Sequence, residues 1–353
     1  MSSTSPASAL ELCFAYAGDI NTPTGGYGYD RRIIAGLEAL GWRVDLLPLG
    51  DTYPFPPQDV LDTAYDRLAA LAPATRVVVD GLAYARLGAR AAELGRHLQL
   101  TALVHHPLCL EHGLSADEAA LLKSEEGAAL AHAQKVIVTS PATAVLVQDL
   151  FAMPVGRIGV VEPGTDPAPA ARGSGGPGVA LISVGSVLPR KGHDLVVAAL
   201  ARLTDLDWSL RIIGGLRDAD CVTSIRRQIE DLGLSNRIEL VGALDSAALE
   251  HAYAAADAIV LASRYEGFGM AFAEALAHGL PVVGSGGAAV QKTFALGGAL
   301  YVEPDDLDGL TDALDKVISD ASLRQSLKQG ALQAAAQLAD WHAAAKLFST
   351  YVE

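Results

Sequence analysis

The chain has 353 residues, of which half are hydrophobic and 19% are charged, and its formal net charge is −15. This length is comfortable for two domains, and the apolar content is enough for sizeable cores. The acidic balance argues against nucleic acid as a partner, because binding the phosphate backbone needs a basic surface. It also argues against simple electrostatic docking on an anionic membrane.

The N-terminus and the cysteines indicate the compartment. The first eight residues, MSSTSPAS, lack the basic start and apolar core of a signal peptide, so we expect a short flexible tail. No apolar run approaches the ~20 residues that a membrane-spanning helix needs. Cys13, Cys109 and Cys221 are odd in number and widely spaced, which is typical of reduced thiols. We therefore expect a cytoplasmic protein whose membrane contact is at most peripheral, at the inner face.

Strand-like and helix-like segments alternate along most of the chain, with helices expected, for example, at residues 29–40 and 115–132. This alternation is typical of βαβ units and parallel sheets, so the predicted fold class is α/β with two Rossmann-like, doubly wound domains. The predicted strands are residues 10–17, 42–49, 76–81, 100–106 and 135–140, followed after a break by 179–185, 208–215, 237–242, 257–263, 280–285 and 298–303.

The break is a stretch rich in Gly, Pro and Ala that has no periodicity, which favours an interdomain linker. We predict an N-terminal domain over residues 1–165, a linker over 166–178 and a C-terminal domain over 179–337. A last helix, at about 338–353, could pack on either domain. Ligands of parallel sheets bind at the carboxyl ends of the strands, so a cleft between two facing sheets is the expected site.

The most informative motif is SRYEGFGMAFAEALAHG, residues 263–279, which follows a predicted buried strand. Gly267, Phe268 and Gly269 form a turn, and a helix begins at Met270. The free N–H groups and the dipole at a helix N-terminus favour an anion. Glu266 and Glu274 flank this turn, and carboxylates accept hydrogen bonds from sugar hydroxyls. Two acids at this spacing are also common as solvated residues, so the hypothesis needs support from the rest of the chain.

Two further loops are suited to phosphate. Arg190 and Lys191 follow the strand at 179–185, just before a predicted helix, so charge and helix dipole have the same sign there. In the first half, Gly25, Gly26 and Gly28 lie between the first strand and the first helix. A Gly-rich loop in this place lets the backbone approach a phosphate.

The glycine loop is not a dinucleotide fingerprint, because Arg31 occupies the third-glycine position of G-x-G-x-x-G. His105 and His106 end the fourth predicted strand, where the cleft is expected. No metal-ligand cluster accompanies these histidines in the sequence, so we expect no metal site. The sequence Asp205-Leu206-Asp207 imitates a D-x-D metal motif but precedes a strand, and we interpret it as a solvated turn at the opposite end of the sheet.

Taken together, SRYEGFGMAFAEALAHGLPVV, VLPRKGHD and TGGYGYD resemble the retaining nucleotide-sugar glycosyltransferases of family 4, which have the GT-B fold of two facing Rossmann-like domains. The resemblance covers nearly the whole chain, and the E-x7-E segment is its most specific part. It implies a hexosyltransferase that moves a hexosyl group from a UDP- or GDP-linked sugar to an acceptor hydroxyl. Retention of configuration and the absence of a metal or cofactor are also implied.

The resemblance also implies roles for individual residues. Glu266 would contact the donor sugar, Glu274 the ribose hydroxyls, and His105 the sugar's outer hydroxyl. Arg190 and Lys191 would neutralise the diphosphate, and the last helix would return to the acceptor-side first domain. Ser186 stands where many relatives carry Arg. The expected catalytic residues are Glu266, His105, Lys191 and Arg190, and the expected substrate-binding residues are Gly25, Gly26, His106, Ser186, Gly267, Phe268, Gly269, Met270 and Glu274.

Two alternatives remain from the residues alone: a nucleotide-sugar epimerase or hydrolase of the same fold, and a non-catalytic nucleotide-binding module. The acceptor, a glycan, a lipid-linked sugar or a small molecule, is not named by any motif. It is expected to contact loops at 21–30, at 108–115 and after residue 140. Arg86 and Arg90 share one face of a predicted helix that could touch anionic lipid, although a plain solvated helix fits the pattern better.

Overall fold

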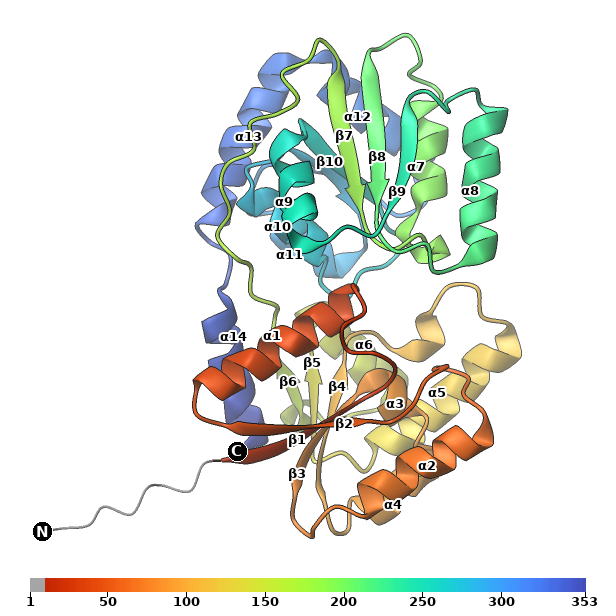
Figure 1. Ribbon diagram of the computed structural model, residues 1–353, viewed down its shortest axis with the longest axis vertical. Coiled ribbons are helices and arrows are strands. Elements are labelled where there is room, and N and C mark those ends of the chain that lie inside the picture. Colours follow the sequence, from red (N-terminus) through yellow and green to blue (C-terminus); the bar gives the residue numbers. More distant parts are fainter. Residues whose placement is uncertain (1–9) are drawn as a thin grey trace, which may run out of the picture. The chain divides into compact units, whose positions relative to one another are not determined.

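The computed structural model describes residues 10–353, so the predicted flexible tail lies outside the described residues. The described chain divides into two compact units (Figure 1). The first unit comprises residues 10–22, Gly26–Pro163 and Trp341–Glu353. The second unit comprises Pro23–Gly25 and Gly164–Asp340. The second unit is therefore almost entirely an insertion between two parts of the first.

The first unit has a six-stranded parallel sheet in the order β2-β1-β3-β4-β5-β6. Its strands are β1 (Glu11–Tyr16), β2 (Arg43–Pro48), β3 (Arg76–Asp80), β4 (Gln99–Val104), β5 (Lys135–Val138) and β6 (Ile158–Val160). Its helices are α1 (Gly25–Ala39), α2 (Gln58–Ala69), α3 (Gly81–Ala85), α4 (Ala91–Leu94), α5 (Ala116–Leu130), α6 (Pro141–Phe151) and α14 (Trp341–Val352), with 3-10 turns η1 (Gly88–Arg90), η2 (Leu108–Leu110) and η3 (Val155–Arg157).

The second unit repeats this design with the strand order β12-β11-β10-β7-β8-β9, again all parallel. Its strands are β7 (Val179–Val184), β8 (Trp208–Ile213), β9 (Ile238–Gly242), β10 (Ala258–Ala262), β11 (Val282–Ser285) and β12 (Ala299–Tyr301). Its helices are α7 (His193–Leu200), α8 (Ala219–Asp231), α9 (Ser246–Ala255), α10 (Met270–Ala277), α11 (Ala288–Phe294), α12 (Leu307–Ser319) and α13 (Ala321–Ala335), and η4 (Pro189–Lys191) precedes α7.

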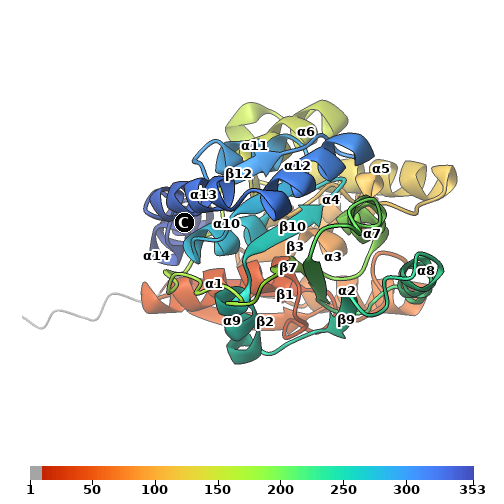
Figure 2. The ribbon, with the colours of Figure 1, turned by 90° about the horizontal axis from the view of Figure 1, so that it is seen from above.

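Helices cover both faces of the second sheet, with α7, α8 and α12 on one side and α9, α10, α11 and α13 on the other (Figure 2). The sequence of the central strand β10 is continuously apolar because all five of its residues are buried. Ala258 and Val260 belong to the core on one face, whereas Ile259 and Leu261 belong to the core on the other. The strand therefore anchors the loop that follows it from both sides.

The predicted fold class is confirmed: each unit is a doubly wound, parallel α/β structure. The eleven predicted strands all occur, with small shifts at their ends. The strand β6 was not predicted. It has only three residues, Ile-Gly-Val, and pairs with β5 at the edge of the sheet, so it is too short to produce a periodic pattern.

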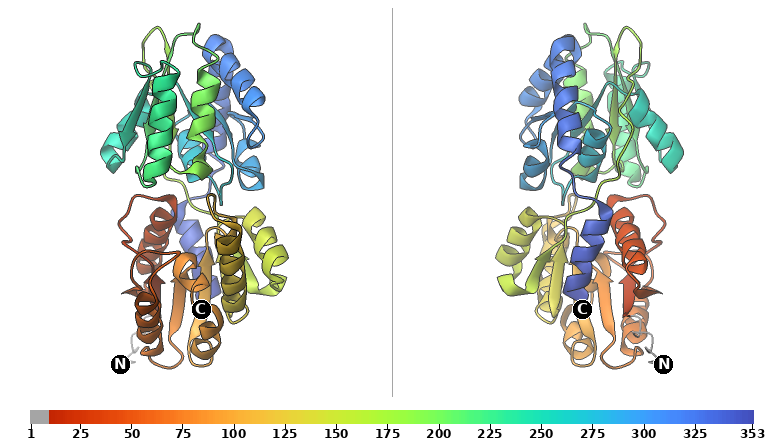
Figure 3. Two further views of the ribbon diagram at one scale, coloured as in Figure 1. Left: turned by 90° about the vertical axis from the view of Figure 1, so that its right-hand side faces the viewer. Right: turned by 90° about the vertical axis from the view of Figure 1, so that its left-hand side faces the viewer.

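The stretch that the sequence suggests as a linker packs on the second unit. Ala171 is buried, its N–H donates to the carbonyl of His278 (2.7 Å), and its own carbonyl accepts from Lys328 Nζ (2.7 Å). The last helix, α14, belongs to the first unit and packs on α1, where any side chain at Gly36 would collide with Ala345 (Figure 3). Within residues 10–353, no helix is long and apolar enough to cross a membrane.

The arginines considered for lipid contact are engaged within the protein. Arg86 pairs with Glu125 at 2.7 Å and its side chain is only 9% exposed. Arg90 pairs with Asp62 at 2.7 Å. The two arginines do not lie on one helix, because Arg86 follows α3 and Arg90 ends η1. The helical-face hypothesis is therefore wrong. Asp205 and Asp207 are exposed just before β8, as expected for a solvated turn, and the three cysteines are free thiols.

Candidate active site

The core of the site in the second unit is a buried carboxylate in the loop between β10 and α10. Glu266 is 6% exposed. Its Oε1 accepts hydrogen bonds from Lys191 Nζ and from Ser263 Oγ, each at 2.6 Å. Arg190 Nη1 lies 3.8 Å from Oε2. Burial by itself would raise the pKa of Glu266, but the charges of Lys191 and Arg190 outweigh it and the pKa lies below its ordinary value. The carboxylate is therefore ionised and fixed in place.

Lys191 and Glu266 are 75 residues apart in sequence and meet because β7 and β10 are neighbours in the sheet. The close approach of the two loops depends on Gly192, which has φ +64°. A side chain at Gly192 would collide with the carbonyl oxygen of Ala262 at the end of β10. The left-handed backbone conformation and the missing Cβ both require glycine. The sequence thus allows the Lys-bearing turn to lie directly on the strand that leads to Glu266.

A second arginine, which the sequence did not single out, locks these loops together. The N–H of Arg264 donates to the carbonyl of Arg190 (2.8 Å), and Arg190 Nη1 donates to the carbonyl of Tyr265 (3.0 Å). The guanidinium of Arg264 binds both carboxylate oxygens of Asp194 at 3.0 and 2.7 Å and also Asp305 at 2.8 Å. Such a bidentate pair fixes orientation as well as distance. Arg264 therefore holds the start of α7 against the loop of Glu266.

Helix α10 begins at Met270, four residues after Glu266. Gly269 is the N-cap with φ +91°, and a Cβ there would lie 2.8 Å from Val290 Cγ1 and 2.9 Å from Phe272 Cδ2. Gly267, Phe268 and Met270 are partly exposed around this cap. The first N–H groups of a helix have no acceptor within the helix, so the turn presents donors. The segment is therefore a suitable cradle for an anion beside Lys191.

Glu274 lies one turn into α10 and is partly buried. Its Oε2 accepts a hydrogen bond from the hydroxyl of Tyr253 at 2.9 Å. Burial raises the pKa of Glu274, although the Tyr253 hydrogen bond and the charge of Lys191 act in the opposite direction. Two carboxylates of one loop–helix segment thus have different environments: Glu266 is ion-paired, whereas Glu274 is held by a phenol.

Ser186 follows β7 and is partly exposed, and its Oγ would lie 3.8 Å from a Cβ at Gly215. The neighbouring His193, which begins α7, is fully buried, and its Nδ1 lies 3.2 Å from Ser183 Oγ. Burial, together with the charge of Lys191, lowers the pKa of His193 to about 4, so this imidazole is neutral. The positive charge of the loop therefore resides on Lys191 and Arg190.

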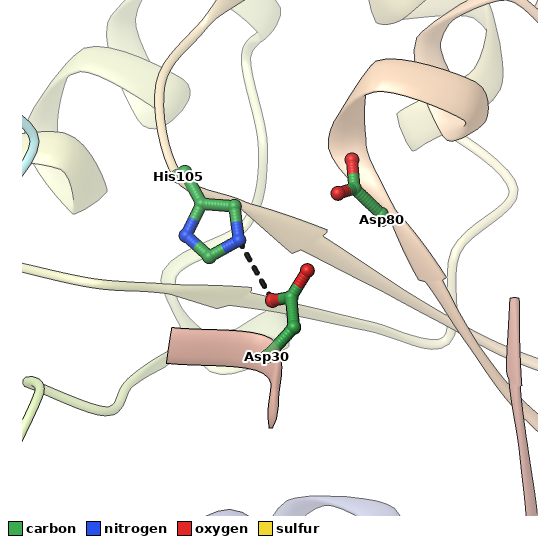
Figure 4. A group of neighbouring side chains, drawn as sticks. All are labelled: Asp30, Asp80 and His105. Atoms are coloured by element: carbon green, nitrogen blue, oxygen red, sulfur yellow. Dashed lines mark hydrogen bonds and ion pairs between the residues drawn. The ribbon is translucent and has the colours of Figure 1, made fainter. Parts of the chain in front are cut away.

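The first unit contains a second group of polar side chains, drawn in Figure 4. His105 follows β4, Asp80 ends β3 and Asp30 comes from α1. His105 Nε2 lies 2.9 Å from Asp30 Oδ1. Asp30 and Asp80 are 0% and 2% exposed, and Asp30 Oδ2 has no hydrogen-bond partner. The sequence predicted His105 but neither of the two aspartates.

The charges in this group are balanced by protons. Burial, followed by the charge of Asp30, raises the pKa of Asp80 to about 7. Burial would lower the pKa of His105, but Asp30 and Asp80 more than compensate and the pKa is raised. Near neutral pH the group therefore gains or loses protons readily, which is the property of acid–base sites.

The expectation that no metal-ligand cluster accompanies the histidines is wrong for His105. Ligand atoms of Asp30, Asp80 and His105 all lie within 4.8 Å of one another. Two carboxylates and an imidazole are a donor set that divalent cations accept. However, Asp30 is already bonded to His105, and Asp80 Oδ1 accepts from the N–H of Leu82 (2.6 Å) as the cap of α3. A proton on Asp80, whose pKa is raised to about 7, reduces the same excess of negative charge.

The glycine loop differs from its prediction. Gly25, Gly26 and Gly28 do not precede the first helix but form its first turn, because α1 begins at Gly25. Glycine disfavours helix interiors, so the sequence pattern placed the start of the helix too late. A Cβ at Gly26 would lie 3.5 Å from His105 Cδ2, and one at Gly28 would meet nothing within 4 Å. His106 is not part of the Asp30 group, and its Nε2 lies 3.8 Å from Glu111 Oε2.

Residues 170–334 match the family model of glycosyl transferases group 1, a range that includes Lys191, Glu266 and Glu274. The D-inositol 3-phosphate glycosyltransferase of Stackebrandtia nassauensis is 28% identical over 241 residues, which are 63% of this chain and 54% of that protein. The chain spans about half the length of the curated relatives it matches.

Solved structures extend the similarity to the whole fold. A sucrose-phosphate synthase from Thermosynechococcus elongatus has a TM-score of 0.82 and 21% identity, covering 97% of this chain and 98% of that one. The Anabaena protein HepE, solved in complex with UDP and glucose, has a TM-score of 0.70 and 16% identity, covering 96% and 98%. The fold of the chain is therefore that of the GT-B glycosyltransferases.

Proposed function

We propose that this protein is a retaining glycosyltransferase that moves a hexosyl group from a nucleoside diphosphate sugar to an acceptor hydroxyl. The observation that carries the proposal is the buried Glu266 with the partly buried cations Lys191 and Arg190 beside the start of α10. The matched family segment contains all of these residues. Together with Glu274 and the start of α10 they combine fixed cations, helix N–H donors and two carboxylates, which is what a diphosphate joined to two sugars requires.

The donor is held by its charged and hydroxylated parts. Lys191, Arg190 and the first turn of α10 bind the diphosphate, and Glu274 binds the ribose hydroxyls. Glu266 contacts the hexose next to the bond that breaks. A uridine or guanosine diphosphate sugar is the proposed donor, and the UDP and glucose of the HepE complex support the uridine choice. His105 and its aspartates contribute to the sugar or acceptor side of the reaction.

The difficult step is the departure of a diphosphate from an oxocarbenium-like anomeric carbon. The C1–O bond to the phosphate breaks, the acceptor oxygen bonds to C1 on the same face, and the acceptor's proton passes to a phosphate oxygen. Lys191 and Arg190 stabilise the charge that develops on the leaving group. A preorganised donor of this kind is worth roughly 2.7–4 kcal/mol in comparable oxyanion sites. The proposed reaction uses no metal ion, since the two cations and the helix dipole take that role.

The experiment is a thermal-shift panel of UDP, GDP, ADP and their common sugars, with and without a chelator. One nucleotide should raise Tm strongly whether or not the chelator is present, and Lys191→Ala should remove most of this shift. Turnover of the selected donor with candidate acceptors, followed by NMR of the product, reports the anomeric configuration. Donor breakdown or epimerisation that needs no acceptor would favour the alternative enzyme class. If no nucleotide stabilises the protein, or if binding needs a divalent ion, the proposal is wrong.

A further inference from the structure

Glu274, the carboxylate that we propose binds the ribose, is held by a residue from another helix. Tyr253, in α9, is 2% exposed and donates its hydroxyl proton to Glu274 Oε2 at 2.9 Å. We propose that Tyr253 is a positioning residue for the nucleotide: it fixes the carboxylate of Glu274 so that its other oxygen meets the ribose hydroxyls. This inference rests on the proposed function, because it assigns a task to Tyr253 within that same site.

The ring of Tyr253 is itself fixed by α10. It stacks on the ring of His278, with centroids 4.7 Å apart and planes inclined by 11°. Glu274 and His278 are four residues apart, so they lie on one face of α10 and its end. One side chain of this face packs against the Tyr253 ring, and the other accepts its hydroxyl. The tyrosine is thus bound at two points to the helix that carries the ribose carboxylate.

His278 is in turn anchored from two directions. Its Nδ1 lies 3.2 Å from the carbonyl of Pro169, and its Nε2 lies 3.3 Å from Glu250 Oε2. The stack therefore cannot slide without breaking contacts to α9 and to the segment that enters the second unit. A buried phenol with a fixed ring holds its oxygen in one place, and Glu274 is the acceptor found within hydrogen-bond distance.

The effect on ligand binding depends on whether the carboxylate of Glu274 is already ordered when the nucleotide arrives. With Oε2 held by Tyr253, the second oxygen of Glu274 has a fixed place before the nucleotide arrives. Without the hydroxyl, Glu274 must be ordered by the ligand, and burial favours its protonated form, which accepts hydrogen bonds less well. Loss of the hydroxyl should therefore weaken nucleotide binding through the ribose and leave the diphosphate contacts intact.

The test compares Tyr253→Phe with the unaltered protein, since phenylalanine keeps the ring and its stack on His278. We expect Kd for the selected nucleotide and KM for its sugar to rise about tenfold, as for a lost hydrogen bond to a charged group, with kcat nearly unchanged. The decisive readout uses 2′-deoxy and 3′-deoxy analogues. The unaltered protein should bind one or both of them more weakly than the ribonucleotide, and Tyr253→Phe should lose most of that discrimination.

Two further variants separate positioning from packing. Tyr84→Phe removes another buried hydroxyl, which donates to the carbonyl of Ala129 in the first unit (3.2 Å), and should lower Tm without changing nucleotide affinity. In a Glu274→Gln background, Tyr253→Phe should add little to the loss already present. If Tyr253→Phe weakens ribo- and deoxynucleotides equally, or keeps full affinity and discrimination, the inference is wrong while the proposed function stands. If the unaltered protein binds no nucleotide, the proposed function fails and takes this inference with it.

Discussion

The two units bury carboxylates at the carboxyl ends of similar six-stranded sheets, but they neutralise them in opposite ways. In the second unit, Glu266 has Lys191 and Arg190 beside it, and its pKa is lowered. In the first unit, Asp80 is buried at the end of β3, and burial raises its pKa to about 7; Glu126, buried in α5, likewise has its pKa raised to about 8. The second unit therefore holds a permanently ionised carboxylate with its cations, whereas the first unit holds acids that exchange protons.

The difference indicates what each edge is suited to bind. Fixed cations paired with a buried carboxylate can transfer part of their attraction to an incoming anion without rearrangement. The group of Asp30, Asp80 and His105, in which the pKa of Asp80 is about 7, is poorly suited to an anion and better suited to hydroxyl groups that give and take protons. Under the proposed function, we therefore expect the leaving diphosphate at the second unit and hydroxyl chemistry at the first.

The largest effect is expected for Lys191→Ala. It removes the hydrogen-bonded cation of Glu266, and turnover should fall about 10²–10³-fold, as when an oxyanion donor is lost. Ser186→Ala is the matched control, because Ser186 lies beside the same loop and adds no charge. Steady-state kinetics with the selected donor measures both variants. Equally small losses in the two would contradict a diphosphate site at Lys191.

A smaller effect is expected for Asp30→Asn in the first unit. The amide oxygen can still accept a hydrogen bond from His105 Nε2, but the negative charge that raises the pKa of His105 is gone. The pKa of His105 should fall, which NMR titration of its ring protons measures. The maximal turnover in a pH–activity profile should drop about tenfold, as for one weakened hydrogen bond. An unchanged His105 titration would show that the two side chains are not coupled.

Asp80→Asn should change stability in a pH-dependent way. The folded-state pKa of Asp80, about 7, lies above the ordinary value of 3.8. The folded protein then holds an extra proton in this window, so the free energy of unfolding falls as pH rises from about 4 through 7. Asparagine can still cap α3 through Leu82 but does not ionise. Thermal denaturation should show a higher Tm for the variant at pH 8.5 and little difference at pH 4.

The smallest effect is expected for Glu126→Gln, which tests the same rule in α5. The pKa of Glu126 is raised from 4.5 to about 8 by burial, so ionisation again costs stability as pH rises across that window. Glutamine can keep the acceptor for Leu108 N–H (2.9 Å). Its amide NH₂ would replace Oε1, which has no hydrogen-bond partner, and this offsets part of the gain. A slight rise in Tm at pH 9 is expected, and a clear fall there would contradict a buried neutral acid.

The sequence placed Lys191 and Glu266 at the same end of the second sheet because both residues follow strands, and the structure brings them into contact. Lys191 comes after β7 and Glu266 after β10, and these strands are hydrogen-bonded neighbours, with Leu181 opposite Ala258. The same rule could have joined Asp80 to His105, since β3 and β4 also pair, with Val79 opposite Ala102. The residues close to His105 in sequence do not include Asp80, so metal-ligand spacing around the histidines does not reveal it.

Other parts of the site leave no such signal. Asp30 reaches His105 from the second turn of α1, and Tyr253 reaches Glu274 from α9, so both contacts depend on how a helix packs on its sheet. The sequence pattern does not distinguish Arg264 from other charged residues, and its contact with Asp194 is visible only in the structure. Strand order can be inferred from hydrophobic pattern, whereas helix rotation and loop contacts depend on side-chain packing that the pattern does not encode.

Tyr29 links the two places where the chain leaves and re-enters the first unit. Its hydroxyl donates to the carbonyl of Val161 at 3.0 Å, and its ring meets Trp341 edge-on at 5.9 Å. On the other side of these points, Thr165 N–H donates to the carbonyl of Ala339 at 2.8 Å. The two ends of the second unit are thus adjacent, like the ends of a cassette. In engineering terms, the second unit is an exchangeable module: under the proposed function, grafting a different nucleotide-binding unit with matched ends there should change the donor while the host sheet keeps its own continuous fold.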